Sequence, residues 1–232
     1  MARDTLVKLG REVVACGRCP RLRRWCQDVA KTKVRRFRDE TYWGRPTPGF
    51  GDPTARLLIV GLAPAAHGAN RTGRVFTGDR SGDFLYAALH RAGFANQAAA
   101  VSRADGLLLK DCYITPIVRC APPANKPTTE ETANCREYLS REWTLLGNVR
   151  AVLALGKLAQ DGLIAALRAI DIVFERRAYA FGHGVSHDIG NGVQLFASYH
   201  PSQQNTFTGR LTPRMLDAVL RDIRQHLRRR SA

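Results

Sequence analysis

The sequence predicts an α/β fold in which helices cover both faces of a mostly parallel sheet. Stretches with helical spacing of apolar residues alternate with short apolar runs, and this alternation is typical of parallel sheets. A chain of 232 residues suits one sizeable domain, so we expect residues 1–232 to fold together, with the basic segment 1–50 integrated. Four runs have the length and composition of buried strands: residues 57–60, 112–118, 149–155 and 193–199.

Taken in order, the chain opens with a helix predicted over residues 3–15, where apolar residues recur at helical spacing. A basic stretch rich in aromatic residues follows, from Arg21 to Arg45. Basic residues mixed with aromatic rings suit an arm that lies over nucleic acid. The alternative is a solvated loop whose rings pack onto the domain.

A long glycine-rich loop, residues 61–82, separates the first strand from a helix predicted over residues 83–90 and stopped by Gly93. In open α/β sheets, ligands bind where such loops leave the carboxyl ends of strands. The loop lacks the Lys-Ser or Lys-Thr of a phosphate-binding P-loop, and its glycines do not fit a dinucleotide fingerprint. Phe76 can stack on a ring and Asp79 adds a carboxylate. An ordinary surface loop of small residues is the alternative.

The second strand contains Pro116, so we expect it to end there or to be edge-like at that point. A loop at residues 119–127 follows, and Thr128 with Glu131 forms the capping box of a helix that runs to about residue 146. Residues 157–169 form another predicted helix. Residues 181–192 are predicted to be a glycine-rich hairpin or loop.

The fourth strand ends in a turn that begins at His200. Thr212 and Pro213 then serve as N-cap and first-turn residue of the last helix, which ends in arginines. His183 and His187 lie close in the sequence, but no carboxylate–histidine pattern supports a metal site there.

The net charge is +16, and residues 1–45 alone carry thirteen Lys or Arg against five Asp or Glu. Such an excess favours a polyanionic partner, of which nucleic acid is the commonest. Arginine-biased codon usage is the alternative. The sequence has neither an apolar run long enough to span a bilayer nor a signal peptide, so we expect a cytoplasmic protein without a membrane partner.

Four of the six cysteines have the spacing of metal ligands. Cys16 and Cys19 form a C-x2-C pair, and Cys120 and Cys135 form a C-x14-C pair. Disulfides are not expected in the cytosol, so this set indicates zinc or an iron–sulfur cluster. Cys112 is predicted to be a buried apolar residue, and Cys26 has no assigned role.

Three loops leave strand ends on one side of the predicted sheet, and they carry Asp79, Asn125 and His200. Together with Phe76 and the small residues of the first loop, they form a pocket suited to a flat, hydrogen-bonding ring. An asparagine amide offers both a donor and an acceptor, so Asn125 can read the edge of such a ring.

These motifs together resemble the family 5 uracil-DNA glycosylases, the iron–sulfur branch of that superfamily. The resemblance rests on residues 61–82, residues 119–127, the turn at 198–212 and the four spaced cysteines, in consistent order along the chain. It implies a three-layer αβα fold with a central four-stranded parallel sheet, and hydrolysis of the N-glycosidic bond of uracil in DNA. It also implies a structural 4Fe–4S cluster on Cys16, Cys19, Cys120 and Cys135.

The resemblance assigns roles to individual residues. Ala65 stands where other branches carry a water-activating polar residue, so Asp79, Asn125 and His200 are the candidate catalytic groups. We expect the flipped base to be bound by Gly61, Ala63, Ala65, Ala66, His67, Asn70, Phe76 and Asn125. We expect DNA to be contacted by Arg71, Arg74, Ser202, Gln204, Asn205, Arg210 and Leu211, with Leu211 as an apolar wedge in the duplex.

The expected substrate is double- or single-stranded DNA containing uracil, with hypoxanthine and other deaminated bases also accepted. We expect a monomer that is associated with the nucleoid. Each site residue also has a structural interpretation: Asp79 as a helix N-cap, Asn125 as a turn residue and His200 as a core histidine. The alternative function is a non-catalytic nucleic-acid-binding protein with an iron–sulfur cluster or zinc.

Overall fold

The computed structural model describes residues 4–172 and 179–229 and has an α/β architecture. Its sheet has six strands in the order β1-β3-β2-β4-β6-β5. The four central strands are parallel and are the four that the apolar runs predict. The strands are β1 (Phe50–Gly51), β2 (Leu57–Gly61), β3 (Cys112–Pro116), β4 (Ala151–Leu155), β5 (Ser186–Asp188) and β6 (Gln194–Ser198).

The prediction of a four-stranded sheet is therefore incomplete, because two short antiparallel strands extend its edges. β1 pairs with β3, and β5 pairs with β6 as part of the predicted hairpin region. Strands of two and three residues show no apolar run in the sequence, and only their pairing defines them. The prediction for Pro116 is confirmed, since it is the last residue of β3, opposite Gly61.

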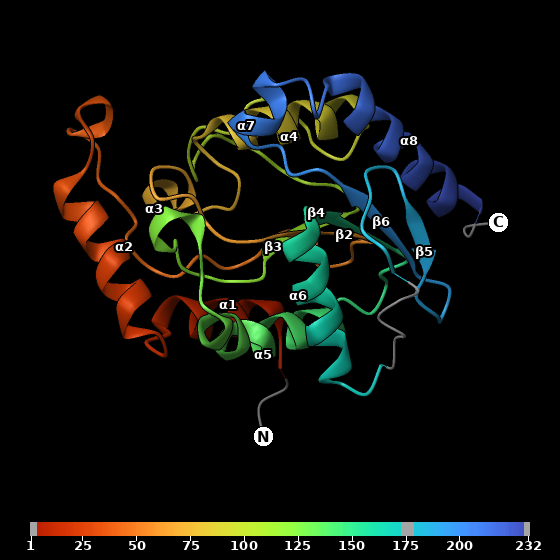
Figure 1. Ribbon diagram of the computed structural model, residues 1–232, viewed down its shortest axis with the longest axis horizontal. Coiled ribbons are helices and arrows are strands. Elements are labelled where there is room, and N and C mark those ends of the chain that lie inside the picture. Colours follow the sequence, from red (N-terminus) through yellow and green to blue (C-terminus); the bar gives the residue numbers. More distant parts are fainter. Residues whose placement is uncertain (1–3, 173–178, 230–232) are drawn as a thin grey trace.

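Two layers of helices cover the sheet, as Figure 1 shows: α1, α5 and α6 lie below it, and α4, α7 and α8 lie above it. The helices are α1 (Leu6–Ala15), α2 (Pro20–Thr32), α3 (Ala69–Thr72), α4 (Arg80–Arg91), α5 (Thr129–Leu145), α6 (Lys157–Arg168), α7 (Gln203–Phe207) and α8 (Pro213–Arg229), with short 3-10 turns η1 (Arg35–Phe37) and η2 (Pro123–Asn125).

Alternation of side chains along the strands produces a core on each face of the sheet. In β2, Leu58 and Val60 pack in the core beneath α5 and α6. Leu57 and Ile59 point the other way, into the core beneath α4 and α8. All the central strands are buried on both faces, as expected for a parallel sheet between two helical layers.

The N-terminal segment packs against the rest of the fold. α1 lies along α5, and its Leu9 and Val13 pack with Tyr138. The first part of the basic stretch that follows forms α2, which the sequence did not predict as a helix. Leu22 and Cys26 of α2 are buried in the same core as α5 and α6, while most of its basic side chains are exposed.

The predicted helix boundaries are confirmed where capping residues mark them. Thr128 and Glu131 form the reciprocal capping box of α5. Thr212 Oγ1 accepts a hydrogen bond from the Met215 N–H at 3.3 Å, as an N-cap of α8 would. Within the described ranges, no helix is both long and apolar enough to cross a bilayer.

Candidate active site

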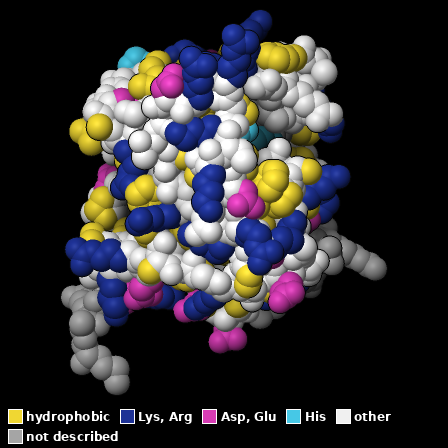
Figure 2. Space-filling model, turned by 90° about the vertical axis from the view of Figure 1, so that its left-hand side faces the viewer, with side chains coloured by type: hydrophobic (Ala, Val, Ile, Leu, Met, Phe, Trp, Pro, Cys, Tyr) yellow, Lys and Arg dark blue, Asp and Glu magenta, His cyan; other side chains and the backbone are white. Residues whose placement is uncertain are grey.

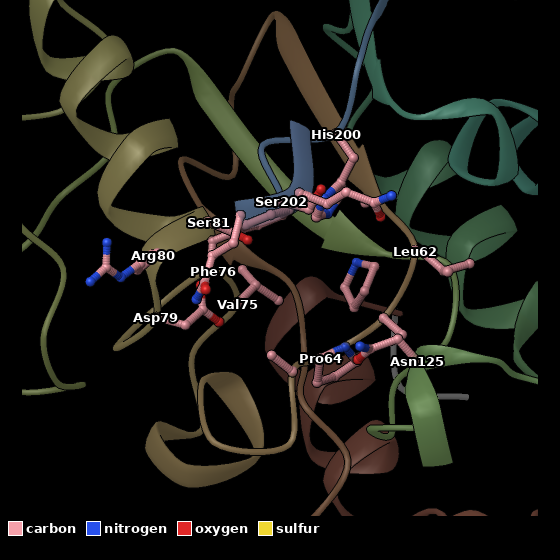
Figure 3. A pocket seen from close by; sticks show the side chains of 16 residues that line it. Leu62, Pro64, Val75, Phe76, Asp79, Arg80, Ser81, Asn125, His200 and Ser202 are labelled. Atoms are coloured by element: carbon pink, nitrogen blue, oxygen red, sulfur yellow. The ribbon is translucent and has the colours of Figure 1, made fainter. Parts of the chain in front are cut away.

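A cavity of about 470 Å³ opens at the carboxyl ends of β2, β3 and β6. Figure 3 shows it from close by, with Asp79 and Asn125 on opposite sides. The loop after β2 forms much of the wall, and the loops after β3 and β6 complete it. The lining residues are Gly61, Leu62, Ala63, Pro64, Ala65, Val75, Phe76, Asp79, Arg80, Ser81, Pro116, Asn125, His200, Ser202, Gln203 and Gln204.

Phe76 lies in the wall of the cavity close to His200. The two ring centroids are 5.9 Å apart, and the planes are tilted by 33°. A side chain on Gly61 would come within 2.9 Å of the Phe76 ring, so the end of β2 needs glycine there. Phe76 itself has a φ of 50°, a left-handed conformation that non-glycine residues rarely adopt.

Asp79 caps α4, as its structural interpretation predicts, and it also lines the cavity. Its Oδ1 accepts a hydrogen bond from the Gly82 N–H at 2.9 Å. A Cβ on Gly68 would overlap the Asp79 carboxylate, so this glycine makes room for it. Burial raises the pKa of the Asp79 carboxyl, although the hydrogen bond from Gly82 opposes that shift.

His200 enters the cavity from the turn after β6. Its carbonyl accepts a hydrogen bond from Asn205 Nδ2 at 2.9 Å, which fixes the turn. Removal of the imidazole from water lowers the pKa of His200 to about 4, so the ring is neutral at physiological pH. A neutral imidazole can still donate one hydrogen bond.

Asn125 reaches the cavity from η2, on the loop after β3. Its backbone N–H donates to the Pro122 carbonyl at 3.1 Å, and its φ of 56° is left-handed. Asparagine tolerates this conformation better than most residues, so the turn interpretation also holds. The side chain is exposed and available to a ligand.

The structure does not bring Ala66, His67 or Asn70 to the cavity. His67 Nδ1 lies 3.1 Å from the Tyr42 hydroxyl, and the two rings pack edge to face. Asn70 is buried, and its Nδ2 donates to the Cys26 carbonyl at 3.2 Å. These side chains hold the loop against the N-terminal segment, a tertiary contact that no local pattern indicates.

Arg71 and Arg74 are also structural, which corrects their assignment to DNA. Both are buried. Arg71 pairs with Glu40 and donates to the Gly78 carbonyl at 2.7 Å. Arg74 forms a buried ion pair with Asp105 at 2.6 Å. A buried, paired arginine is unavailable to a phosphate unless the pair breaks.

The turn after His200 supplies a further correction. Leu211 is 0% exposed and packs in the core beneath α4 and α8, so it is not placed as a wedge. The exposed apolar side chain of this region is Phe207, at the end of α7, which is 67% exposed. The guanidinium of Arg80 lies 5.3 Å from the centroid of its ring.

The other residues predicted to contact DNA surround the mouth of the cavity. Ser202 and Gln204 line it, and Arg210 is exposed with its guanidinium 4.6 Å from the Tyr199 ring centroid. Asn205 instead positions His200. Sequence reasoning missed seven lining residues that lie in or beside the predicted loops: Leu62, Pro64, Val75, Arg80, Ser81, Pro116 and Gln203.

The four spaced cysteines are brought together where α1, α2, α5 and the loop after β3 meet. Cys19, Cys120 and Cys135 are buried and belong to one core cluster, and Cys16 is half-buried. Burial raises the pKa of Cys19 and Cys135, and neighbouring thiols of the set raise it further. Within residues 4–172 and 179–229, however, no three His, Cys, Asp or Glu side chains are arranged to hold a metal ion.

A buried ion pair anchors the loop that carries Cys120. Arg119 and Glu142 are almost completely buried and lie 2.6 Å apart. Thr47 N–H donates to the Arg119 carbonyl at 2.7 Å, so the loop is also tied to the N-terminal segment. This network fixes both the cysteine and the start of the segment that leads to Asn125.

Basic side chains are spread over the face of the molecule shown in Figure 2, which is the left-hand side of Figure 1, where α2 and α3 lie. Exposed basic residues in α2 and around η1 include Arg24, Lys31, Arg35, Arg36 and Arg38. Part of the net charge of +16 therefore lies on one side of the molecule, where a polyanion can bind.

Comparison with known proteins gives consistent results. The profile of the Uracil DNA glycosylase superfamily matches residues 48–224. A type-5 uracil-DNA glycosylase of Mycobacterium tuberculosis is 51% identical over 222 residues, 95% of this chain and 81% of the relative. That of Thermus thermophilus is 48% identical over 213 residues, covering 92% and 94%. A type-4 uracil-DNA glycosylase of Archaeoglobus fulgidus is 27% identical over 201 residues, covering 86% and 82%.

Proposed function

Because this chain belongs to the uracil DNA glycosylase superfamily and excises uracil from DNA, we propose that the cavity at the ends of β2, β3 and β6 is where the base is bound and released. The observation that carries this proposal is the convergence of Asp79, Asn125 and His200 on one cavity. A base inside a duplex must be flipped out before its glycosidic bond can be reached. A cavity of about 470 Å³ has the size of a small-molecule site.

The base is held by stacking and by its hydrogen-bonding edge. Phe76 offers the ring face, since it lines the cavity beside His200. The exposed Asn125 amide supplies a donor and an acceptor to the edge of the base. Backbone groups of the small residues Ala63 and Ala65 line the same cavity and add further polar contacts. The absence of bulky side chains there supports acceptance of hypoxanthine as well as uracil.

Bond cleavage builds negative charge on the departing base and positive charge on the sugar. The neutral His200 ring, its pKa lowered by burial, donates a hydrogen bond to the base anion. The Asp79 carboxylate stabilises the sugar cation or orients the attacking water. Capping of α4 fixes the position of this carboxylate, so it needs no reorganisation as charge develops.

Opening of the duplex requires an apolar group in the place of the flipped base. Leu211 is buried, so we assign this wedge to Phe207, which protrudes from α7 beside the cavity. Arg80 and Arg210 flank the same region and are exposed. Arg80 lies over the Phe207 ring, and flanking cations of this kind suit DNA phosphates.

We assign a structural 4Fe–4S cluster to Cys16, Cys19, Cys120 and Cys135. The chemistry of four thiolates fits both zinc and iron–sulfur clusters. The cysteines are near enough to affect one another's pKa. Because they come from the N-terminal segment, the loop after β3 and α5, a cluster held by them would link the N-terminal segment to the loop carrying Asn125.

We propose that the protein acts as a monomer, because Asp79, Asn125 and His200 of a single chain meet in one cavity. We further propose that residues 1–232 form one domain, since α1 and α2 share cores with the rest of the fold. A DNA substrate also supports a location in the cytoplasm at the nucleoid.

The test of the function is strand cleavage at abasic sites after incubation with duplexes that hold uracil or hypoxanthine opposite each normal base. We expect cleavage with both bases. Single strands containing uracil are also expected to react. DNA binding without any base release would instead indicate a non-catalytic binding protein. Asp79→Asn serves as the matched control, because it keeps the shape of the side chain and removes its charge.

A further inference from the structure

His183 is a half-buried histidine next to the turn that carries His200, and the proposed reaction has no use for it. The sequence pairs it with His187, but the structure gives each ring its own partners. His187 Nε2 lies 3.0 Å from the Ala180 carbonyl. The His183 ring is directed instead at the end of β6, immediately before His200.

Three contacts join His183 to this strand end. Its Nδ1 accepts a hydrogen bond from the Tyr199 N–H at 3.4 Å and lies 3.3 Å from Ser198 Oγ. The ring also stacks on Tyr199, with centroids 5.2 Å apart and planes inclined by 28°.

These contacts define the protonation state of the ring. A peptide N–H can only donate, so the Nδ1 that faces it must carry no proton. The remaining ring proton is then on Nε2. Burial lowers the pKa of His183, which agrees with a neutral ring. His183 is therefore an acceptor toward the strand end at physiological pH.

The orientation of His200 depends on this strand end. Among the described residues, no side chain or backbone group hydrogen-bonds the His200 ring. Its backbone is instead held from both sides: Asn205 donates to the His200 carbonyl at 2.9 Å, and His183 accepts the N–H of the preceding residue, Tyr199. Behind it lies Gly156, where a Cβ would be 3.4 Å from the His200 Cβ, an ordinary van der Waals contact.

We propose that His183 is a positioning residue for His200: by accepting the Tyr199 N–H and stacking on the Tyr199 ring, it aims the His200 imidazole into the cavity. The inference rests on the proposed role of His200 in the reaction. Misplacement of a catalytic group by about 1 Å can lower a rate roughly 10²-fold.

Two variants of His183 test its hydrogen-bond acceptor and its aromatic ring separately. In His183→Asn, Oδ1 stands at the same number of bonds from the backbone as Nδ1, so the acceptor is kept and the ring is lost. In His183→Phe, the ring is kept and the acceptor is lost. We expect single-turnover excision of uracil to fall about 10- to 100-fold in His183→Phe. In His183→Asn the loss is expected to be less than about fivefold, since the conservative variant restores the acceptor.

Binding and stability controls distinguish positioning from a general structural role. The Kd for duplex DNA with an abasic-site analogue should stay unchanged in His183→Phe, and its rate should fall at temperatures where it is fully folded. His187→Phe is the matched control, because it alters the other histidine of the same region and should keep the wild-type rate.

A double variant tests the route through His200. If His183 acts by orienting that ring, His183→Phe should lower the rate no further in a His200→Ala background. Full additivity would overturn the inference, as would equal losses in His183→Phe and His183→Asn, or a loss of binding that matches the loss of rate. The role of His200 itself fails separately, if His200→Ala alone leaves excision unchanged.

Discussion

Asp79 combines a structural and a chemical position in one carboxylate. Its hydrogen bond with Gly82 caps α4, and its second face is turned to the cavity. Helix caps are often read as purely structural, but a cap that lines a pocket is also a fixed charge. The close approach of Gly68 and the burial of the carboxyl show that water does not surround this charge on every side.

Substitution of Asp79 with Asn should separate these two roles. Asparagine is as good an N-cap as aspartate, and removal of a buried charge does not weaken the fold. We expect the single-turnover rate to fall about 10²- to 10⁴-fold while the melting temperature stays the same or rises. Rates and thermal unfolding of the same preparation provide the measurement. If the melting temperature fell together with the single-turnover rate, Asp79 would have only the capping role.

The dependence of the rate on pH should reflect Asp79 on the acid side. Burial raises its pKa, so the carboxylate that the reaction needs is lost on acidification at a higher pH than for an ordinary aspartate. His200 has its pKa lowered to about 4, so it contributes no inflection near pH 6.5. Single-turnover rates from pH 5 to 8 would show one acid limb, which Asp79→Asn should abolish. An inflection at the ordinary histidine pKa would contradict a neutral His200.

At the level of elements, α7 determines which apolar side chain can meet DNA. The helix has only five residues and is capped by Ser202, whose Oγ accepts from the Asn205 N–H. It ends with Phe207 exposed, and the chain then returns to the core at Leu211. The same short helix places Asn205 against the His200 carbonyl. It therefore links the proposed DNA-contacting surface to the turn that carries His200.

Phe207→Ala should impair the opening of a paired duplex. We expect excision of uracil from well-paired duplexes to fall about 10-fold or more, and excision from single strands to change little, because unpaired bases need no wedge. Leu211→Ala is the comparison variant. The cavity left in the core should destabilise the fold by about 2–5 kcal/mol and so lower the melting temperature. The ratio of the excision rates on paired and single-stranded DNA should stay unaltered. Equal losses on paired and single-stranded DNA would exclude Phe207 as the wedge.

At the level of the whole molecule, the N-terminal segment is held to the α/β core by several independent contacts. Arg141 of α5 pairs with Asp4 and Glu12 at 3.0 and 2.6 Å, Arg21 pairs with Glu131, and α2 buries Leu22 and Cys26. The four cysteines lie among these contacts. A cluster there would fasten the segment to the loop after β3 and to α5.

Loss of a cluster ligand should therefore affect folding more than chemistry. Purified protein is expected to be yellow-brown with stoichiometric iron and sulfide. Cys120→Ser should reduce the yield of folded protein, because a structural metal contributes folding free energy, while folded molecules retain most of the single-turnover rate. Cys112→Ser controls for the loss of a buried thiol outside the set. Colourless protein that contains zinc would contradict the iron–sulfur assignment.

The sequence alone determined the central sheet, the helix caps and the three loops that converge on the cavity. These features depend on local patterns: apolar runs, capping residues and glycines at strand ends. Parallel strands of one sheet end at the same edge, so the loops after β2, β3 and β6 had to leave on one side, whereas the order of the strands came from the structure. Asp79, Asn125 and His200 were therefore predictable from their positions in the chain.

Only the tertiary structure decided which charged and apolar residues of those loops are available to bind a ligand. Arg71, Arg74 and Leu211 have the residue types of DNA contacts. However, Arg71 pairs with Glu40, Arg74 pairs with Asp105, and Leu211 packs in the core beneath α4 and α8. The roles proposed for Phe207 and His183 depend on neighbours that are distant in the sequence and close in the fold, Arg80 and Tyr199. The reason is physical: residue type states what a side chain can bind, whereas burial and the partners it meets decide what remains for a ligand.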